Sequence, residues 1–115
     1  MHVTRFADAK PYDAKAHFGM VGLQLHGGAA NETGLMTCGL SHFLPGGGAE
    51  RSVSPLEKLY FVVAGEITII TDDGETTLAP NDSCWLAPGE ARSIENRGNE
   101  VATIVVVLAK NGAKA

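Results

Sequence analysis

Short runs of β-branched and aromatic residues, separated by turn residues, constrain this chain more than any other feature of its sequence. Such runs favour strands, and glycine, proline, asparagine and aspartate favour the turns between them. The sequence Asp72-Asp73-Gly74-Glu75 predicts a hairpin turn between two such runs. The pattern predicts strands over residues 20–26, 35–44, 58–63, 66–71, 76–78, 83–86, 91–96 and 101–109.

About eight short strands at regular spacing indicate an all-β antiparallel sandwich or barrel. Fourteen of the 115 residues are glycine and five are proline, more than the ordinary usage of about 12% for the two together. The strand over 35–44 is predicted to end at Pro45-Gly46-Gly47-Gly48, and residues 14–18 to form a helical turn at most. We expect one domain over 1–115, with an arm and first strand at 1–20, a barrel core at 35–109 and a frayed tail at 110–115.

Charge and hydropathy exclude several classes of partner. The formal net charge is −4 and lysine and arginine do not cluster, which argues against nucleic acid. The longest apolar runs, residues 59–64 and 101–109, are far shorter than the roughly 20 residues that span a bilayer. No signal peptide is visible, and two cysteines are too few for a disulfide framework, so we expect a cytoplasmic protein with reduced thiols.

Two stretches resemble the paired motifs of the cupin superfamily. The first runs from Pro45-Gly46-Gly47 to Val63-Ala64-Gly65-Glu66, and the second from Leu78-Ala79-Pro80 through Ala87-Pro88-Gly89 to Asn96. The resemblance covers residues 45–96, just under half of the chain. It implies a small cupin-type jelly-roll barrel with one open mouth, commonly dimeric.

The resemblance also shows where the metal ligands of that family would lie. Counting back from Gly65, the glutamate of the first motif falls on Lys58, and its two histidines fall on Ser54 and Ser52. The histidine of the second motif falls on Arg92, while the closing asparagine is present as Asn96. An ammonium or guanidinium group cannot coordinate a cation, so we expect no metal and no other cofactor at these positions.

Strand parity predicts which side chains share the barrel interior. Side chains two residues apart lie on one face, so Tyr60 accompanies Lys58. His42 shares a face with Leu40 and Leu44, although the sequence does not identify that face. We therefore predict a ligand-binding set listed in full here: Ser52, Ser54, Lys58, Tyr60, Arg92 and His42.

Two cations in an apolar barrel need compensation, which a bound anion or a protein carboxylate can provide. The first alternative predicts a pocket for a small organic anion. The second is structural, and pairs the cations with Glu50, Glu57, Glu90 or Glu95.

An enzyme of the lyase, isomerase or oxygenase type is a further alternative, with Lys58, Tyr60 and His42 as candidate catalytic residues. A lysine beside an arginine can have a lowered pKa and act as a base or form a Schiff base. A metal site of unusual composition, built from His17, His26 or His42, also stays open.

Overall fold

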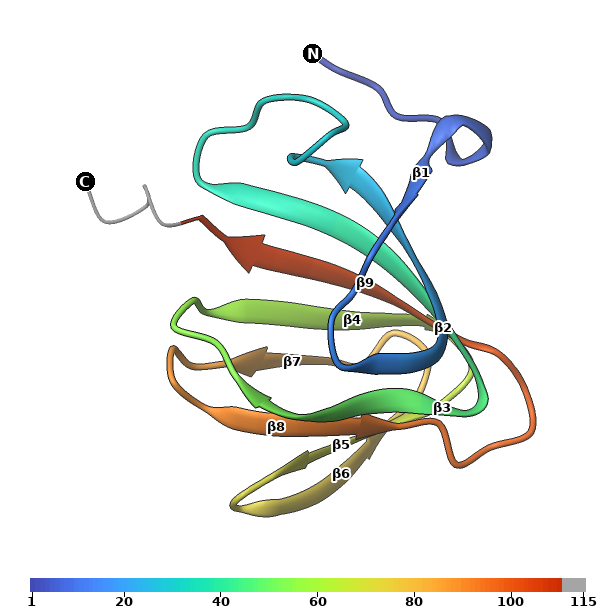
Figure 1. Ribbon diagram of the computed structural model, residues 1–115. Coiled ribbons are helices and arrows are strands. Elements are labelled where there is room, and N and C mark those ends of the chain that lie inside the picture. Colours follow the sequence, from blue (N-terminus) through green and yellow to red (C-terminus); the bar gives the residue numbers. More distant parts are fainter. Residues whose placement is uncertain (111–115) are drawn as a thin grey trace.

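The computed structural model describes residues 1–110 and shows an antiparallel, nearly closed barrel (Figure 1). Within these residues a short 3₁₀-helix, η1, is followed by nine strands. Their bounds are η1 Phe6–Asp8, β1 Lys10–Tyr12, β2 His17–His26, β3 Met36–Val53, β4 Lys58–Ala64, β5 Ile67–Thr71, β6 Gly74–Leu78, β7 Ser83–Leu86, β8 Ala91–Glu95 and β9 Ala102–Ala109. In the described part of the chain, no helix is long and apolar enough to cross a membrane. The antiparallel pairing of the nine strands confirms the predicted all-β barrel.

Strand β3 organises the barrel because it pairs with three neighbours. Its first half pairs with β9 and its second half with β8, while β2 pairs with residues of both halves. The sheet continues from β9 through β4 to β7, and from β8 through β5 to β6, while β1 adds to β2. Figure 1 shows β3 passing through both halves of the barrel.

The predicted end of a strand at Pro45–Gly48 is wrong, because β3 continues through these residues to Val53. The ladder with β2 is interrupted between Phe43 and Gly48, so Pro45 needs no ladder hydrogen bond there. A Cβ atom at Gly47 would collide with the Gly19 carbonyl oxygen, and one at Gly48 with the Ile94 carbonyl oxygen. These glycines bend the strand at a close backbone contact instead of ending it.

The N-terminal segment differs from the prediction as well. Residues 14–18 form no helical turn, because β2 already begins at His17; the short helix lies earlier, at Phe6–Asp8. Strand β1 lies within residues 1–20, where an arm and first strand are expected without exact bounds, and it pairs with β2 through Pro11↔Leu23. Of the predicted tail, Lys110 is hydrogen-bonded to Leu35 and Thr33, and residues 111–115 lie outside the described residues.

The burial of side chains distinguishes the inner face of the barrel from its outer face. Tyr60 and Val62 on β4 are buried, as are Arg92 and Ile94 on β8, which confirms the predicted parity of both strands. The apolar core consists mainly of Phe43, Val62, Ile67, Ile69, Leu78, Ile94, Ala102 and Ile104. The outer face is apolar too: Leu59, Phe61 and Trp85 are exposed.

We propose that this outer face forms an isologous homodimer interface. Leu59 lies beside Trp85 on β7 and Val107 on β9, and Phe61 lies beside Val105, so the apolar side chains form one continuous surface. Burying such a surface in a partner removes it from water, and protects the edge at β7. Light scattering at micromolar concentration should give the mass of two chains.

Placing a charge on this surface should separate the two chains. Phe61→Glu should give the mass of a single chain, whereas Thr76→Glu on the exposed strand β6 should leave the dimer unchanged. A single-chain mass for the unmodified protein would contradict the proposed interface.

Candidate functional site

A cavity of about 230 Å³ opens at the end of the barrel where β4 and β8 begin. Its walls combine aliphatic side chains with a small number of polar and charged ones. The segment between β1 and β2 contributes Asp13, Ala14 and Lys15 to its lining. The lining residues are Tyr12, Asp13, Ala14, Lys15, His17, Ser41, Phe43, Lys58, Tyr60, Arg92, Ile94, Ile104, Val106 and Leu108. We call this cavity the barrel pocket.

Arg92 is the most constrained polar residue of the barrel pocket, with 5% of its surface exposed. Its Nε donates to the Tyr60 hydroxyl at 2.8 Å, and its Nη1 donates to the Ser52 hydroxyl at 2.8 Å and to the Glu50 carbonyl at 3.3 Å. Ser52 lies opposite Arg92 in the β3–β8 ladder, which explains this contact. These bonds fix the guanidinium plane but use only neutral acceptors.

The predicted pairing of the cations with a protein carboxylate is absent within residues 1–110. No carboxylate oxygen lies within 4.0 Å of Arg92 or Lys58 in that range, where the ion pairs join Arg51 to Asp72 and Arg97 to Glu75 and Glu95.

The other candidate carboxylates are engaged elsewhere. Glu57 accepts from the Trp85 indole and Glu90 accepts from the Ala87 amide. Glu50 contributes its backbone carbonyl to Arg92. Among the described residues, Arg92 and Lys58 therefore have no carboxylate within 4.0 Å, and Asp13, which lines the same pocket, lies farther from both.

Lys58 and Tyr60 lie two residues apart on β4 and both face the pocket. Burial lowers the pKa of Lys58, and the neighbouring positive charge of Arg92 lowers it further. Burial raises the pKa of Tyr60, against the opposing effect of Arg92, so the phenol keeps its proton at neutral pH. Because Tyr60 accepts from Arg92, its own O–H is free to donate to a ligand.

The residues at the expected metal-ligand positions do not fit a metal ion. Arg92 donates to Ser52, Ser54 accepts from the Leu56 amide, and Lys58 brings a second cation. Among residues 1–110, no three His, Cys, Asp or Glu side chains come together in a way that could hold a metal ion. The structure therefore suits a ligand of negative charge better than a cation at this end of the barrel.

His17 lines the barrel pocket, whereas the sequence analysis considers it only for a metal site of unusual composition. Its ring stacks on Phe43 with 6.3 Å between centroids, and its Nδ1 lies 2.7 Å from the Lys15 carbonyl. A carbonyl can only accept, so Nδ1 carries the proton and Nε2 is the basic nitrogen of the neutral ring. Burial lowers the pKa of His17, and the charges of Arg92 and Lys58 add to this effect.

Alternation along β2 could not have identified His17, because a register shift between Phe18 and Met20 puts both Met20 and His17 opposite inward-facing residues of β3. The predicted strand began at residue 20, whereas β2 begins at His17, where it pairs with Ala49 of β3. Ser41 and Phe43 were missed for a similar reason, because the sequence did not identify the inner face of β3.

His42 lies on the other face of β3, away from the barrel pocket. Its neighbours Ser41 and Phe43 line the pocket, and strand parity directs His42 outward. There its ring meets Phe6 of η1 edge-on, and its Nδ1 lies 3.0 Å from the Thr103 hydroxyl. The structure brings Ser52, Lys58, Tyr60 and Arg92 together and leaves His42 and Ser54 outside this group.

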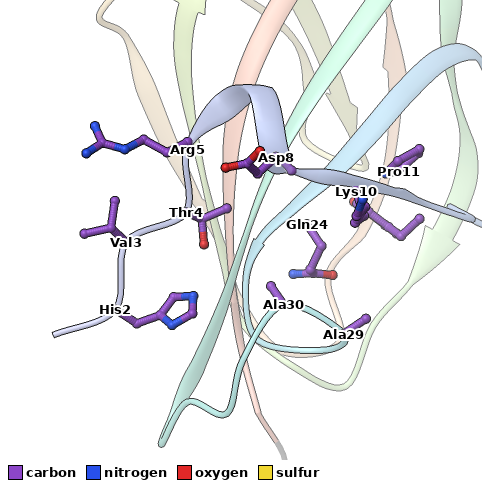
Figure 2. Close-up of a pocket in the computed structure, with 12 residues that line it drawn as sticks. His2, Val3, Thr4, Arg5, Asp8, Lys10, Pro11, Gln24, Ala29 and Ala30 are labelled. Atoms are coloured by element: carbon purple, nitrogen blue, oxygen red, sulfur yellow. The ribbon is translucent and has the colours of Figure 1, made fainter.

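A second cavity, of about 280 Å³, lies between the N-terminal arm and residues 29–30 (Figure 2). Two of its polar side chains have protein partners: the Gln24 amide donates to the carbonyls of His26 and Cys38, and the Thr4 hydroxyl donates to Leu25. Figure 2 shows the Arg5 side chain directed away from Gln24. This cavity is larger, but its charged side chains, Arg5, Asp8 and Lys10, are exposed and carry both signs, whereas Arg92 of the barrel pocket is buried.

Comparisons with known proteins agree on the fold. The sequence model of the cupin domain family matches residues 39–108. A β-D-galactosidase of Mycobacterium tuberculosis is 39% identical over 109 residues, which cover 95% of this chain and 94% of that protein.

Two solved structures show the same fold at low sequence identity. A polyketide cyclase of Streptomyces resistomycificus superposes with a TM-score of 0.84 at 13% identity, over 95% of this chain and 79% of that one. A predicted oxalate decarboxylase of Thermotoga maritima has a TM-score of 0.79 at 20% identity, over 95% of this chain and 98% of that one.

Removing the charge of Lys58 should stabilise the ligand-free protein at neutral pH. The folded protein disfavours the ammonium, as its lowered pKa shows, so Lys58→Met should raise the free energy of unfolding. This difference in the free energy of unfolding should shrink as pH rises from the lowered pKa of Lys58 in the folded protein to the ordinary value of 10.5. Over this range Lys58 loses its proton in the folded unmodified protein, which removes the cost of its buried charge. Urea unfolding at several pH values measures this difference. Lys10→Met on exposed strand β1 is the control, and a destabilised Lys58→Met variant would contradict the argument.

Proposed function

We propose that this protein, which belongs to the cupin family, binds a small organic anion with a carboxylate group in its barrel pocket. The observation that carries the proposal is the pair of cations, Arg92 and Lys58, that line an otherwise largely apolar cavity without a protein carboxylate beside them in the described structure. A buried charge without a counter-ion is costly, and a bound anion offsets that cost.

The arrangement of donors fits a carboxylate. Nε and Nη1 of Arg92 are held by Tyr60, Ser52 and Glu50, and Nη2 has no acceptor among residues 1–110. Among the side-chain polar atoms of residues 1–110 that lack a partner, only His42 Nε2 is fully buried. Arg92 Nη2 also lacks a partner in this range and is therefore not fully buried. A planar guanidinium held in this way is preorganised for a carboxylate, and Lys58 adds a second charge.

The pocket is also suited to a small molecule in size and shape. Its volume of about 230 Å³ is below the roughly 300–1,000 Å³ of sites for drug-sized ligands. Phe43, Ile94 and Ile104 supply apolar contacts, and Tyr60 supplies a hydroxyl donor.

We also propose a cytoplasmic location, because Cys38 and Cys84 are free thiols and such thiols persist in a reducing compartment.

Arg92→Met should weaken the binding of small carboxylates about tenfold or more, since charge-assisted hydrogen bonds contribute roughly 1.5–3 kcal/mol each. Lys58→Met should also weaken binding, and the double variant should be non-additive because one ligand contacts both side chains. Calorimetric titration with acetate, succinate and malonate measures these affinities, and circular dichroism checks that each variant folds.

Arg51→Met provides the matched control, since Arg51 is an exposed arginine paired with Asp72. Its affinities should equal those of the unmodified protein. Equal affinities in Arg92→Met would contradict the proposal, as would the absence of carboxylate binding at millimolar concentration.

Glycoside hydrolysis is a second candidate function, because the relative that is 39% identical over nearly its whole length is named a β-D-galactosidase. Glycosidases ordinarily use two carboxyl groups about 5–9.5 Å apart. Asp13 is the one carboxylate that lines the barrel pocket within the described residues. The geometry therefore supports anion binding better, while the sequence relationship keeps hydrolysis as the alternative.

Hydrolysis of p-nitrophenyl β-D-galactoside tests this alternative. If the barrel pocket catalyses the reaction, Asp13→Asn should reduce the rate at least about 100-fold, the scale of an acid–base contribution. Asp72→Asn, which changes an exposed carboxylate on the far hairpin, should leave the rate unchanged. A rate equal to that of buffer for the unmodified protein would exclude this function.

A further inference from the structure

The charge of the barrel pocket narrows the class of ligand that it can accept. Two cations, Arg92 and Lys58, line its interior, while the exposed pair at its mouth, Asp13 and Lys15, carries one charge of each sign. From this balance we infer that the ligand is a dianion, a small dicarboxylate or a phosphate, which the pocket prefers over a monocarboxylate. The inference rests on the proposed function and specifies its ligand.

A monocarboxylate would leave one interior cation uncompensated. Arg92 Nη2 and Lys58 Nζ have no acceptor among the described residues. Neither atom is fully buried, so both remain accessible to a ligand. The guanidinium reaches β4 at Tyr60, two residues from Lys58 on the same face. A ligand with two anionic groups can therefore contact Arg92 and Lys58 at the same time.

His17 adds a third group that responds to the charge of the ligand. The titratable and charged groups around the pocket are Tyr12, Asp13, Lys15, Lys58, Tyr60 and Arg92. Arg92 and Lys58 both disfavour the imidazolium form of His17. A bound dianion opposes that field, so it raises the pKa of His17 above its value in the ligand-free protein. Binding must then strengthen as pH falls between these two pKa values, because the complex takes up a proton.

Calorimetric titration at pH 7.5 with acetate, succinate, malonate and inorganic phosphate tests the preference. Succinate or malonate should bind at least about tenfold more tightly than acetate, the effect of one added charge-assisted bond. Tighter binding of phosphate than of either dicarboxylate would identify a phosphate-type dianion instead. Lys58→Met should remove the preference over acetate, and Arg51→Met should retain it.

The result separates this inference from the proposed function. If acetate and the dianions bind equally, and Arg92→Met weakens them all, the anion pocket is right and the dianion is wrong. If none of the probes binds, both fail.

Proton NMR titration of the histidine rings provides an independent readout. Saturating succinate, or the tightest-binding dianion, should raise the pKa of His17, while the ring resonances of His26, which does not line the barrel pocket, should not respond to the ligand. His17→Asn assigns the resonance and should abolish the proton uptake that accompanies binding. A pKa of His17 that is unchanged by a bound dianion would overturn the inference that ligand charge reaches this residue.

Discussion

The bend of β3 at Gly46–Gly48 is the constraint on which the rest of the barrel depends. Asn96 holds it from the end of β8: its amide donates to the Gly47 carbonyl, its carbonyl accepts from the Gly46 amide, and its side chain donates to the Phe43 carbonyl. The bend lets one strand join both halves of the barrel. Beyond the bend, a register shift between Ala49 and Ser52 places Ser52 opposite Arg92, so the irregular backbone of β3 determines where the guanidinium lies.

The buried guanidinium is held by geometry more than by charge compensation. Tyr60, Ser52 and the Glu50 carbonyl are neutral, so they orient Arg92 without cancelling its field. That field extends to Lys58 and His17, whose pKa values are both lowered, first by burial. Three groups that would each prefer water therefore share one cavity. Such an arrangement destabilises the empty protein, and an anion relieves it.

Much of the fold could be predicted from the sequence, because turn residues and β-branched runs act locally. The strands over 58–64, 83–86 and 91–95, and the inward parity of Tyr60 and Arg92, needed only this local pattern. The bend of β3 could not be predicted, since the glycines at 46–48 indicate a turn locally, and only the contacts with Gly19 and Ile94 explain a continuous strand. His17 was missed and His42 misplaced because both depend on which faces of β2 and β3 turn inward, a property of the closed barrel.

The family resemblance and the local chemistry describe different parts of the same pocket. The glycines and prolines of both motifs belong to the backbone framework, which is why the barrel forms although the metal-ligand positions hold Ser52, Ser54, Lys58 and Arg92. At those positions lysine and arginine stand where the family pattern has glutamate and histidine, which is why the proposed ligand is an anion. In the family pattern this framework holds histidine and glutamate side chains around a metal ion. In this chain it holds Lys58 and Arg92 around the barrel pocket. The recognition chemistry of a cupin barrel therefore follows from the side chains at a few strand positions, and the fold alone does not determine it.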